Sequence, residues 1–189
     1  HALISGLLSA GADVHDAGMI STPTLAHATR KHSAGVMITA SHNPPEYNGI
    51  KLWNPDGMAF STPQMKEVED FLMEKQAVRQ PWNKLGVYAP YPDAIREHID
   101  SILANVEGAE LKVVVDCGSG AACTITPYLL REMGCHVIAL NAQPDGFFPG
   151  RKVEPTDASL SLLKETVVSS GSDLGIAHDG DGDRMVAVD

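Results

Sequence analysis

The strongest chemical signal in the sequence is a short acidic loop. Asp179, Asp181 and Asp183 alternate with two glycines, and Arg184 follows directly. Glycine permits positive φ angles, so this loop can curl and bring the three carboxylates to one point. Three like charges held together repel one another unless a cation lies among them, and oxygen ligands favour Mg²⁺ or Ca²⁺ over zinc. The spacing therefore predicts a hard-metal site held by the three aspartates.

Two other interpretations of the acidic loop are open. A solvated acidic turn would need no metal. An EF-hand begins with the same D-x-D-x-D pattern, but Arg184 stands where that loop requires glycine. If Mg²⁺ is the ligand, its preference for six-coordination and for phosphate oxygens favours phosphoryl chemistry.

A second candidate centre is a serine in a stiff loop. Ser41 follows an apolar run, and Pro44 and Pro45 exclude regular structure after it. The surrounding residues match neither the G-x-S-x-G turn of hydrolases nor the Walker A phosphate loop. Ser41 could instead carry a phosphate that completes the metal site, with His42 as a donor or proton carrier and Lys51 as a second cation. By residue type alone, the ordinary interpretation is favoured for each of the three: a loop serine, a histidine without a special role and a solvated surface lysine.

The elements that would position these residues alternate between helix and strand. Apolar spacing and capping residues predict helices over 1–11, 23–32, 61 onward, 92–105, about 120–133 and 158–169. Short apolar or β-branched runs predict strands over 14–19, 35–40, 50–53, 111–116, 136–140, 174–177 and 185–188. Thr22 is expected to cap the second helix, with Pro23 at its first position.

This alternation predicts an α/β fold. The strand–helix–strand order over 111–140 predicts parallel strands with a right-handed crossover. A stretch rich in proline and glycine over 79–92 would break any long element, so we expect a domain boundary there. The predicted domains are residues 1–90, with the serine loop, and residues 91–189, with the acidic loop.

Composition excludes several classes of protein. Of the 189 residues, 43% are hydrophobic and 20% are charged, which is typical of a globular chain and not of a disordered one. The net charge of −10 argues against nucleic-acid binding, although local cations or a metal could still receive an anionic substrate. No apolar run is long enough to span a membrane, and no secretory pattern is present. The three cysteines form no C-x-x-C pair, which favours buried thiols and a cytoplasmic location.

Two long motifs resemble those of the α-D-phosphohexomutase superfamily. Residues 37–51 are similar to its phosphoserine loop, and residues 179–184 to its magnesium loop. Shorter similarities to family loops lie at Thr22-Pro23, 145–149 and 154–156. The resemblance spans nearly the whole chain. One departure is Ala-Ser-Leu at 158–160, where members commonly have Glu-Asn-Leu.

The resemblance implies a phosphoglucomutase-like fold of two tandem three-layer α/β domains with mixed, largely parallel sheets, truncated at both ends. It implies a mutase that interconverts hexose 1-phosphate and hexose 6-phosphate through a hexose bisphosphate, which also serves as activator. Ser41 would carry the phosphoryl group and give one oxygen to Mg²⁺. The implied protein ligands are Asp179, Asp181 and Asp183. Lining the transfer site would be His42, Lys51 and Arg184.

Within the family, a phosphomannomutase/phosphoglucomutase is the first interpretation and a phosphoglucosamine mutase the alternative. Other classes are a non-catalytic magnesium-binding homologue and a metal-dependent phosphatase. Family members have four domains, so the resemblance implies that this chain lacks the sugar-gripping loops of the third and fourth and is inactive alone. Oligomeric state and phosphorylation of Ser41 are not predicted.

Overall fold

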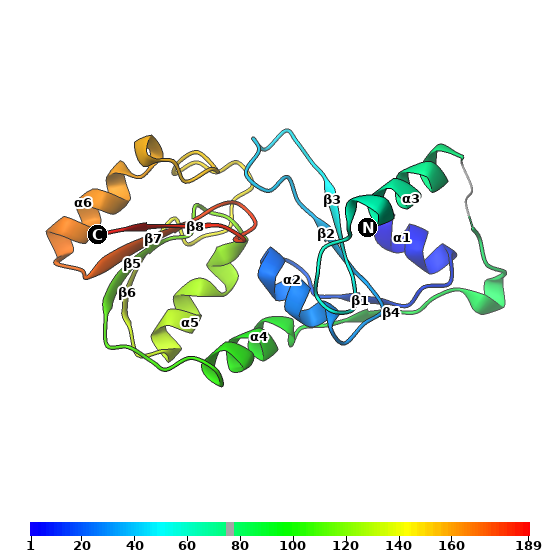
Figure 1. Cartoon of the computed structure of the whole chain (residues 1–189), viewed down its shortest axis with the longest axis horizontal. Helices are drawn as coiled ribbons and strands as arrows, with labels where there is room; N and C mark the ends of the chain where they lie inside the picture. The colour runs from blue at the N-terminus through cyan, green and yellow to red at the C-terminus, as the bar shows by residue number, and fades with distance from the viewer. Residues whose placement is uncertain (75–77) are drawn as a thin grey trace.

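The protein forms two lobes joined by a central helix. In the computed structural model, residues 1–74 and 78–189 are described. Figure 1 shows the N-terminal elements in one lobe and the C-terminal sheet with its helices in the other, with α4 (Ala94–Leu103) lying between them. Among the described residues, no helix has the length and apolar character that crossing a membrane requires.

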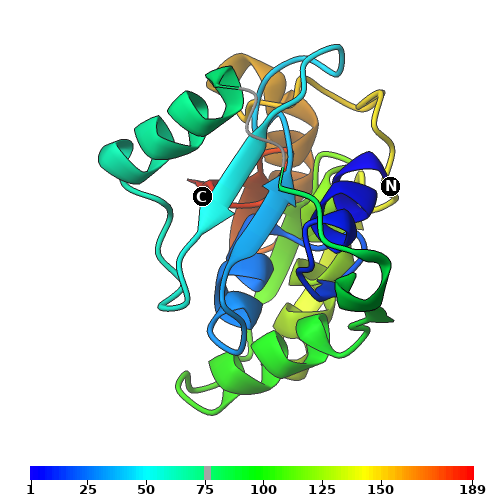
Figure 2. The same ribbon diagram turned by 90° about the vertical axis from the view of Figure 1, so that its right-hand side faces the viewer.

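The first lobe carries the serine loop, residues 39–49, between two paired strands. Its elements are α1 (Ala2–Ser9), β1 (Val14–Asp16), α2 (Thr22–Thr29), β2 (Gly35–Ile38), β3 (Ile50–Trp53), α3 (Thr62–Met73), the 3₁₀ turn η1 (Trp82–Lys84) and β4 (Tyr88–Pro90). Strand β2 pairs antiparallel with β3, and β1 pairs parallel with β4. Figure 2 shows β2 and β3 side by side. The β2–β3 pairing places both ends of the serine loop at one edge of the lobe.

The second lobe is a four-stranded mixed sheet. Its elements after α4 are β5 (Lys112–Asp116), η2 (Ala121–Thr124), α5 (Thr126–Glu132), β6 (His136–Leu140), η3 (Asp157–Ser159), α6 (Ser161–Ser170), β7 (Leu174–His178) and β8 (Met185–Val188). The strand order is β6-β5-β7-β8, with β5 parallel to both neighbours and β8 antiparallel to β7. The predicted α/β class is confirmed, and so is the parallel pairing predicted for the two strands over 111–140.

The core of the second lobe lies on both faces of strand β5. Val114 packs with Leu163 and Val167 of α6 on one face. Val115 packs on the other face in a cluster that includes Cys117 and Cys123. Helix–sheet–helix layering follows, because each face of a central strand must be covered to remove its apolar side chains from water. All three cysteines are free thiols.

Several predicted elements end differently in the structure. The strand expected over 14–19 stops at Asp16, whose carboxylate accepts the N–H of Gly18 at 2.9 Å where Gly18 turns to a φ of 69°. The strand expected over 35–40 ends at Ile38, and the helix expected from 92 begins at Ala94.

Three helices also differ in how they start. The cap of α2 is Ser21, not Thr22, since the Ser21 hydroxyl accepts the Thr24 N–H. The helix expected over 120–133 divides into η2 and α5 at Ile125, whose φ of −132° is not helical. The helix expected over 158–169 begins as η3 and becomes α6 only at Ser161.

Candidate functional site

The acidic loop joins β7 to β8 at the carboxyl end of the parallel strands. Gly182 adopts a φ of 71°, and its N–H donates to the Asp179 carbonyl at 3.2 Å. This curl gathers the loop's carboxylates, so that one oxygen from each of Asp179, Asp181 and Asp183 lies within 4.8 Å of the others. The turn therefore brings together the three carboxylates that the alternating sequence predicts to cluster.

Gly180 is the point where the acidic loop meets the serine loop. A Cβ at this position would lie 2.6 Å from the Ser41 carbonyl oxygen and 2.8 Å from Cγ1 of Val153. On the other side, the Gly180 carbonyl accepts the Ala121 N–H at 2.9 Å. The close approach of the two loops therefore requires a residue without a side chain.

The Asp181 carboxylate is held through only one of its two oxygens. Its Oδ2 accepts hydrogen bonds from Lys51 Nζ at 2.8 Å and from Thr22 Oγ1 at 2.7 Å. Its Oδ1 is buried and has no hydrogen-bond partner among the residues that the structure describes. Burial pushes the pKa of Asp181 upward, but the hydrogen bonds from Lys51 and Thr22 outweigh it and hold the pKa below its usual value. Asp181 is thus a buried, ionised group with one unused oxygen.

Asp179 is fully buried and is engaged by Arg184. The Arg184 Nε donates to Asp179 Oδ2 at 3.0 Å, and the Arg184 backbone N–H donates to Oδ1 at 3.2 Å. Burial nevertheless raises the pKa of Asp179, and the charges of the neighbouring aspartates add to this rise. The guanidinium also lies 3.7 Å from Glu154. Arg184 therefore offsets charge on one side of the cluster.

Lys51 offsets charge on the other side. The antiparallel register sets Lys51 opposite Met37, so the chain folds back after the serine loop and delivers the lysine to the site. Its ammonium contacts Asp181 and also Asp183, at 3.2 Å. Burial lowers the pKa of Lys51, but its two carboxylate partners outweigh this effect and raise it. The lysine is charged and bridges two of the three carboxylates.

Ser41 occupies a conformation that few residues other than glycine adopt. Its φ is 55°, and its N–H donates to Thr39 Oγ1 at 2.8 Å. The Thr39 N–H in turn donates to the Gly49 carbonyl at 3.0 Å, which closes the base of the loop. Nδ1 of His42 lies 3.4 Å from Ser41 Oγ. Left-handed backbone at a non-glycine residue is costly and is found disproportionately at functional sites.

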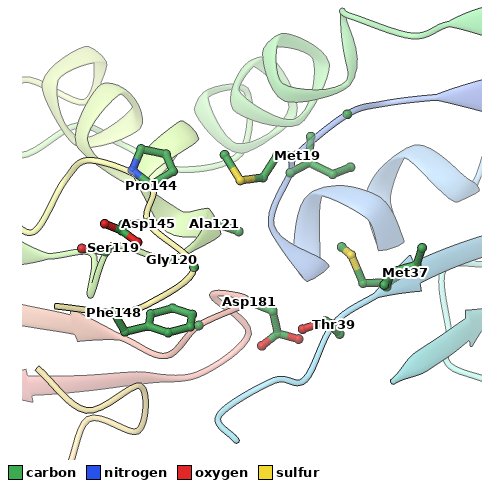
Figure 3. Close-up of a pocket in the computed structure, with 15 residues that line it drawn as sticks. Met19, Met37, Thr39, Ser119, Gly120, Ala121, Pro144, Asp145, Phe148 and Asp181 are labelled. Carbon is green, nitrogen blue, oxygen red and sulfur yellow. The ribbon is translucent and has the colours of Figure 1, made fainter. Parts of the chain in front are cut away.

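An open cleft of about 640 Å³ borders this site and is lined by both lobes. Figure 3 shows Asp181 facing Thr39 across the lobe boundary, with Phe148 beside the acidic loop. Met19 and Met37 form part of the opposite wall. A ligand in this cleft would reach the acidic loop without passing through the core.

The structure thus brings the sequence-predicted residues together from two contacting loops and from the start of β3. They differ in whether their side chains touch the three aspartates. Lys51 and Arg184 pair directly with the aspartates, and His42 lies beside Ser41. Among the described residues, the side chains of Ser41 and His42 make no hydrogen bond or ion pair with the three aspartates. The two loops meet here through backbone, at Gly180 and Ser41.

Three further residues at the site were not assigned a role from sequence. Thr22 binds Asp181, Glu154 lies near Arg184, and Arg151 is buried beneath the acidic loop. Thr22 precedes a proline, a pattern that suggests a helix cap and gives no sign of a hydrogen bond to Asp181. Glu154 and Arg151 lie in a long loop whose course no local pattern reveals.

Arg151 fastens that long loop to the ends of two strands. Its Nε donates to Asp116 Oδ2 at 2.8 Å, and both side chains are almost wholly buried. Its other nitrogens donate to backbone carbonyls, including His178 O directly before the acidic loop. Asn141 and Gly118 supply hydrogen bonds to the second Asp116 oxygen. The ion pair is therefore fully satisfied, as a buried charge requires.

The donor set fits a hard divalent cation. The candidate ligands are all carboxylate oxygens, the chemistry that Mg²⁺ and Ca²⁺ prefer. Among the described residues, Asp181 Oδ1 is buried without a partner. Burying a charged oxygen in this way costs free energy unless the oxygen coordinates a cation. Lys51 and Arg184 neutralise two of the three negative charges, which leaves one for a metal to offset.

Comparisons with known proteins find relatives over nearly the whole chain. The family models described as phosphoglucomutase/phosphomannomutase, alpha/beta/alpha domains I and II, match residues 1–79 and 89–189. Two relatives named "Probable phosphoglucosamine mutase" are 58% identical, from Methanosarcina acetivorans, and 62% identical, from Methanocella arvoryzae. Each alignment covers 100% of this chain, but only 44% and 43% of the relatives.

A solved structure extends the agreement to three dimensions. A phosphoglucomutase/phosphomannomutase family protein from Burkholderia thailandensis superposes with a TM-score of 0.88 at 28% identity, over 99% of this chain and 42% of that one. The chain therefore spans less than half the length of these three proteins. With both domain models matched along the sequence, the chain belongs to the phosphoglucomutase/phosphomannomutase family.

Proposed function

We propose that this chain supplies the phosphoserine and the magnesium site of an α-D-phosphohexomutase. The observation that carries the proposal is the buried, unpartnered Oδ1 of Asp181 within a cluster of three carboxylates. The serine loop lies against this cluster, with Ser41 in a left-handed conformation. A metal-binding module alone would not need a serine held in this way.

The proposed substrate is a hexose phosphate, and glucosamine phosphate is the preferred one. The relatives with 58% and 62% identity carry the name phosphoglucosamine mutase, whereas glucose and mannose are supported only at the level of the family. This reverses the order of the two interpretations drawn from the sequence. A whole protein of this activity would include regions beyond the two domains, because this chain covers 44% of its relative. We propose that the two domains alone do not turn over substrate.

The proposed chemistry is transfer of a phosphoryl group between Ser41 and a sugar hydroxyl. The sugar oxygen forms a bond to phosphorus, and the bond from phosphorus to Ser41 Oγ breaks. The hydroxyl proton of the sugar ends on Ser41 Oγ. His42, whose Nδ1 lies 3.4 Å from that oxygen, is placed to deliver it. The reverse transfer, from the other phosphate of the bisphosphate, restores the phosphoserine.

The cations of the site would balance the charge of this transfer. A bound Mg²⁺ would supply electrostatic stabilisation of the phosphoryl oxygens, held by Asp179, Asp181, Asp183 and a phosphoserine oxygen. With the divalent ion, the cluster of three carboxylates, Lys51 and Arg184 changes from one net negative charge to one net positive charge. That positive charge would offset part of the negative charge of the phosphoryl group carried on Ser41.

Two further proposals concern the whole chain. We propose a domain division at about residue 90, where β4 ends after pairing with β1. We also propose a cytoplasmic location, because the three cysteines are free thiols, as expected in a reducing compartment.

A coupled mutase assay tests the proposed function. The full-length protein would be assayed with Mg²⁺, a trace of hexose bisphosphate and the 1-phosphates of glucosamine, mannose and glucose. We expect the highest kcat/KM with glucosamine 1-phosphate and loss of activity in Ser41→Ala. Absence of isomerisation with all three sugars, in protein that binds magnesium, would refute the mutase. Release of free phosphate in place of isomerisation would indicate a phosphatase.

A further inference from the structure

A residue of the first lobe is bound directly to a proposed metal ligand of the second. Thr22, the first residue of α2, donates from Oγ1 to Asp181 Oδ2 at 2.7 Å and from its backbone N–H to the Asp181 carbonyl at 2.9 Å. The two residues lie 159 positions apart in the sequence. Thr22 is 5% exposed and Asp181 is 3% exposed, so water does not compete for these hydrogen bonds.

These contacts determine which Asp181 oxygen is left for a cation. Lys51 and Thr22 both donate to Oδ2, and no group in the described ranges 1–74 and 78–189 hydrogen-bonds to Oδ1. A carboxylate held through one oxygen by two donors from different elements cannot exchange its oxygens by rotation without breaking both bonds. Lys51 also donates to Asp183, so two carboxylates determine where its ammonium lies. Of the three aspartates, the Thr22 side chain contacts Asp181 alone.

The backbone around Thr22 is fixed independently of the metal. The Ser21 hydroxyl accepts the Thr24 N–H and lies 2.8 Å from the Thr24 hydroxyl. Thr24 is fully buried, and its hydroxyl lies 3.0 Å from Nδ1 of His98 in α4. The start of α2 is therefore a rigid platform from which the Thr22 hydroxyl is presented.

We propose that Thr22 is a positioning residue that aligns the Asp181 carboxylate for the divalent cation, and so couples the docking of the first domain to metal affinity. The inference rests on the proposed metal site. It assigns Thr22 no contact with substrate or with the reacting atoms. A purely structural role would lower stability without changing the affinity for metal.

Binding of Mg²⁺ alone to the full-length protein, measured by isothermal titration calorimetry, tests this role. Thr22→Val removes the hydroxyl and keeps the shape, and Thr22→Ser keeps the hydroxyl. Loss of a partner that orients a ligand typically weakens metal affinity by about 10-fold or more. We expect that weakening in Thr22→Val and near-native affinity in Thr22→Ser. If the valine variant does not fold by circular dichroism, Thr22→Ala carries the same expectation.

Two controls give the outcomes their meaning. Thr29→Ala removes another buried hydroxyl of α2, which donates to the Leu25 carbonyl, and should leave the magnesium Kd unchanged. Asp181→Asn should abolish binding, and native affinity in that variant would overturn the metal site itself. If Asp181→Asn abolishes binding but Thr22→Val binds like the native protein, the positioning role alone is wrong. Equal weakening in Thr22→Ser and Thr22→Val would also overturn it.

Discussion

Lys51 of β3 donates a 2.8 Å hydrogen bond to Asp181, which follows it by 130 positions and lies in the other lobe. The serine loop begins and ends in the first lobe. Lys51, which follows this loop in the sequence, forms ion pairs with Asp181 and Asp183 of the second lobe. Lys51 from the first lobe thus offsets the charge of Asp181 and Asp183 in the second. The site is therefore a property of the interface between the domains and depends on how firmly they dock.

Replacing Lys51 with methionine should lower the free energy of unfolding. Asp181 would lose a charged partner while remaining buried, and a loss of this kind costs about 1–3 kcal/mol. Urea denaturation measures the cost. Lys66→Met is the matched control, because Lys66 pairs with Asp70 on the exposed face of α3, where such pairs contribute less than about 1 kcal/mol. Equal losses in the two variants would contradict the importance assigned to Lys51.

Gly180→Ala should separate the two loops. The added Cβ would lie 2.6 Å from the Ser41 carbonyl, so one loop must move, and a displacement near 1 Å can reduce a catalytic rate by about 100-fold. The turnover number of the full-length protein measures this effect. Gly6→Ala, where a Cβ meets nothing within 4 Å, should leave the rate unchanged. A native rate in Gly180→Ala would show that the loop contact is not required.

Arg151→Met should cause the largest loss of stability. It leaves Asp116 as an unpaired buried charge and removes the donor to His178 O, and breaking a buried pair costs about 3–5 kcal/mol. Arg96→Met removes solvent-screened, exposed pairs with Asp100 and Glu132 and should cost much less stability than Arg151→Met. Thermal unfolding of both variants compares them. A small loss in Arg151→Met would mean that the long loop is held by other contacts.

The contact between α2 and α4 should make the protein sensitive to mild acid. His27 and His98 stack there with ring centroids 5.0 Å apart, and burial lowers the pKa of each from its usual value of 6.5. A histidine whose pKa is lower in the folded state binds protons more readily when unfolded. Its neutral form therefore stabilises the fold fully above pH 6.5, and this contribution is lost as pH falls below that value.

Unfolding free energies measured between pH 8 and pH 5 test the acid sensitivity. His27→Gln should reduce the decline with falling pH. His136→Gln, which alters an exposed histidine of β6, should retain the full decline. A decline of the same size in His27→Gln and in the native protein would exclude His27 as a source.

The parts of the site that follow from sequence are those encoded within a few residues. Alternating Asp and Gly at 179–183 is enough to predict a curled carboxylate cluster, and the prolines after Ser41 are enough to predict a stiff loop. The pairing of Lys51 with Asp181 needed the antiparallel register of β2 and β3 as well as the docking of two lobes. No local propensity contains that information.

The fold shows the same division. The alternation of helix and strand is visible in apolar spacing where an element buries apolar side chains, as β5 and α6 do. The break at Ile125 and the late start of α6 are not visible, because tertiary packing decides them. Thr22 illustrates the limit most clearly. A threonine before proline suits a cap, yet its hydroxyl binds a carboxylate 159 residues away.

That long separation also sets the order in which the protein can assemble. Translation proceeds at about 5–20 residues per second, so on the order of ten seconds pass between synthesis of Thr22 and synthesis of Asp181. During this interval the emerging first lobe presents Thr22 and Lys51 without their partners, and capture of the proposed metal would have to wait for the second lobe to fold and dock. Acquisition of the ion would then be among the last folding events, and a chain interrupted before residue 181 would carry the serine loop without the means to use it.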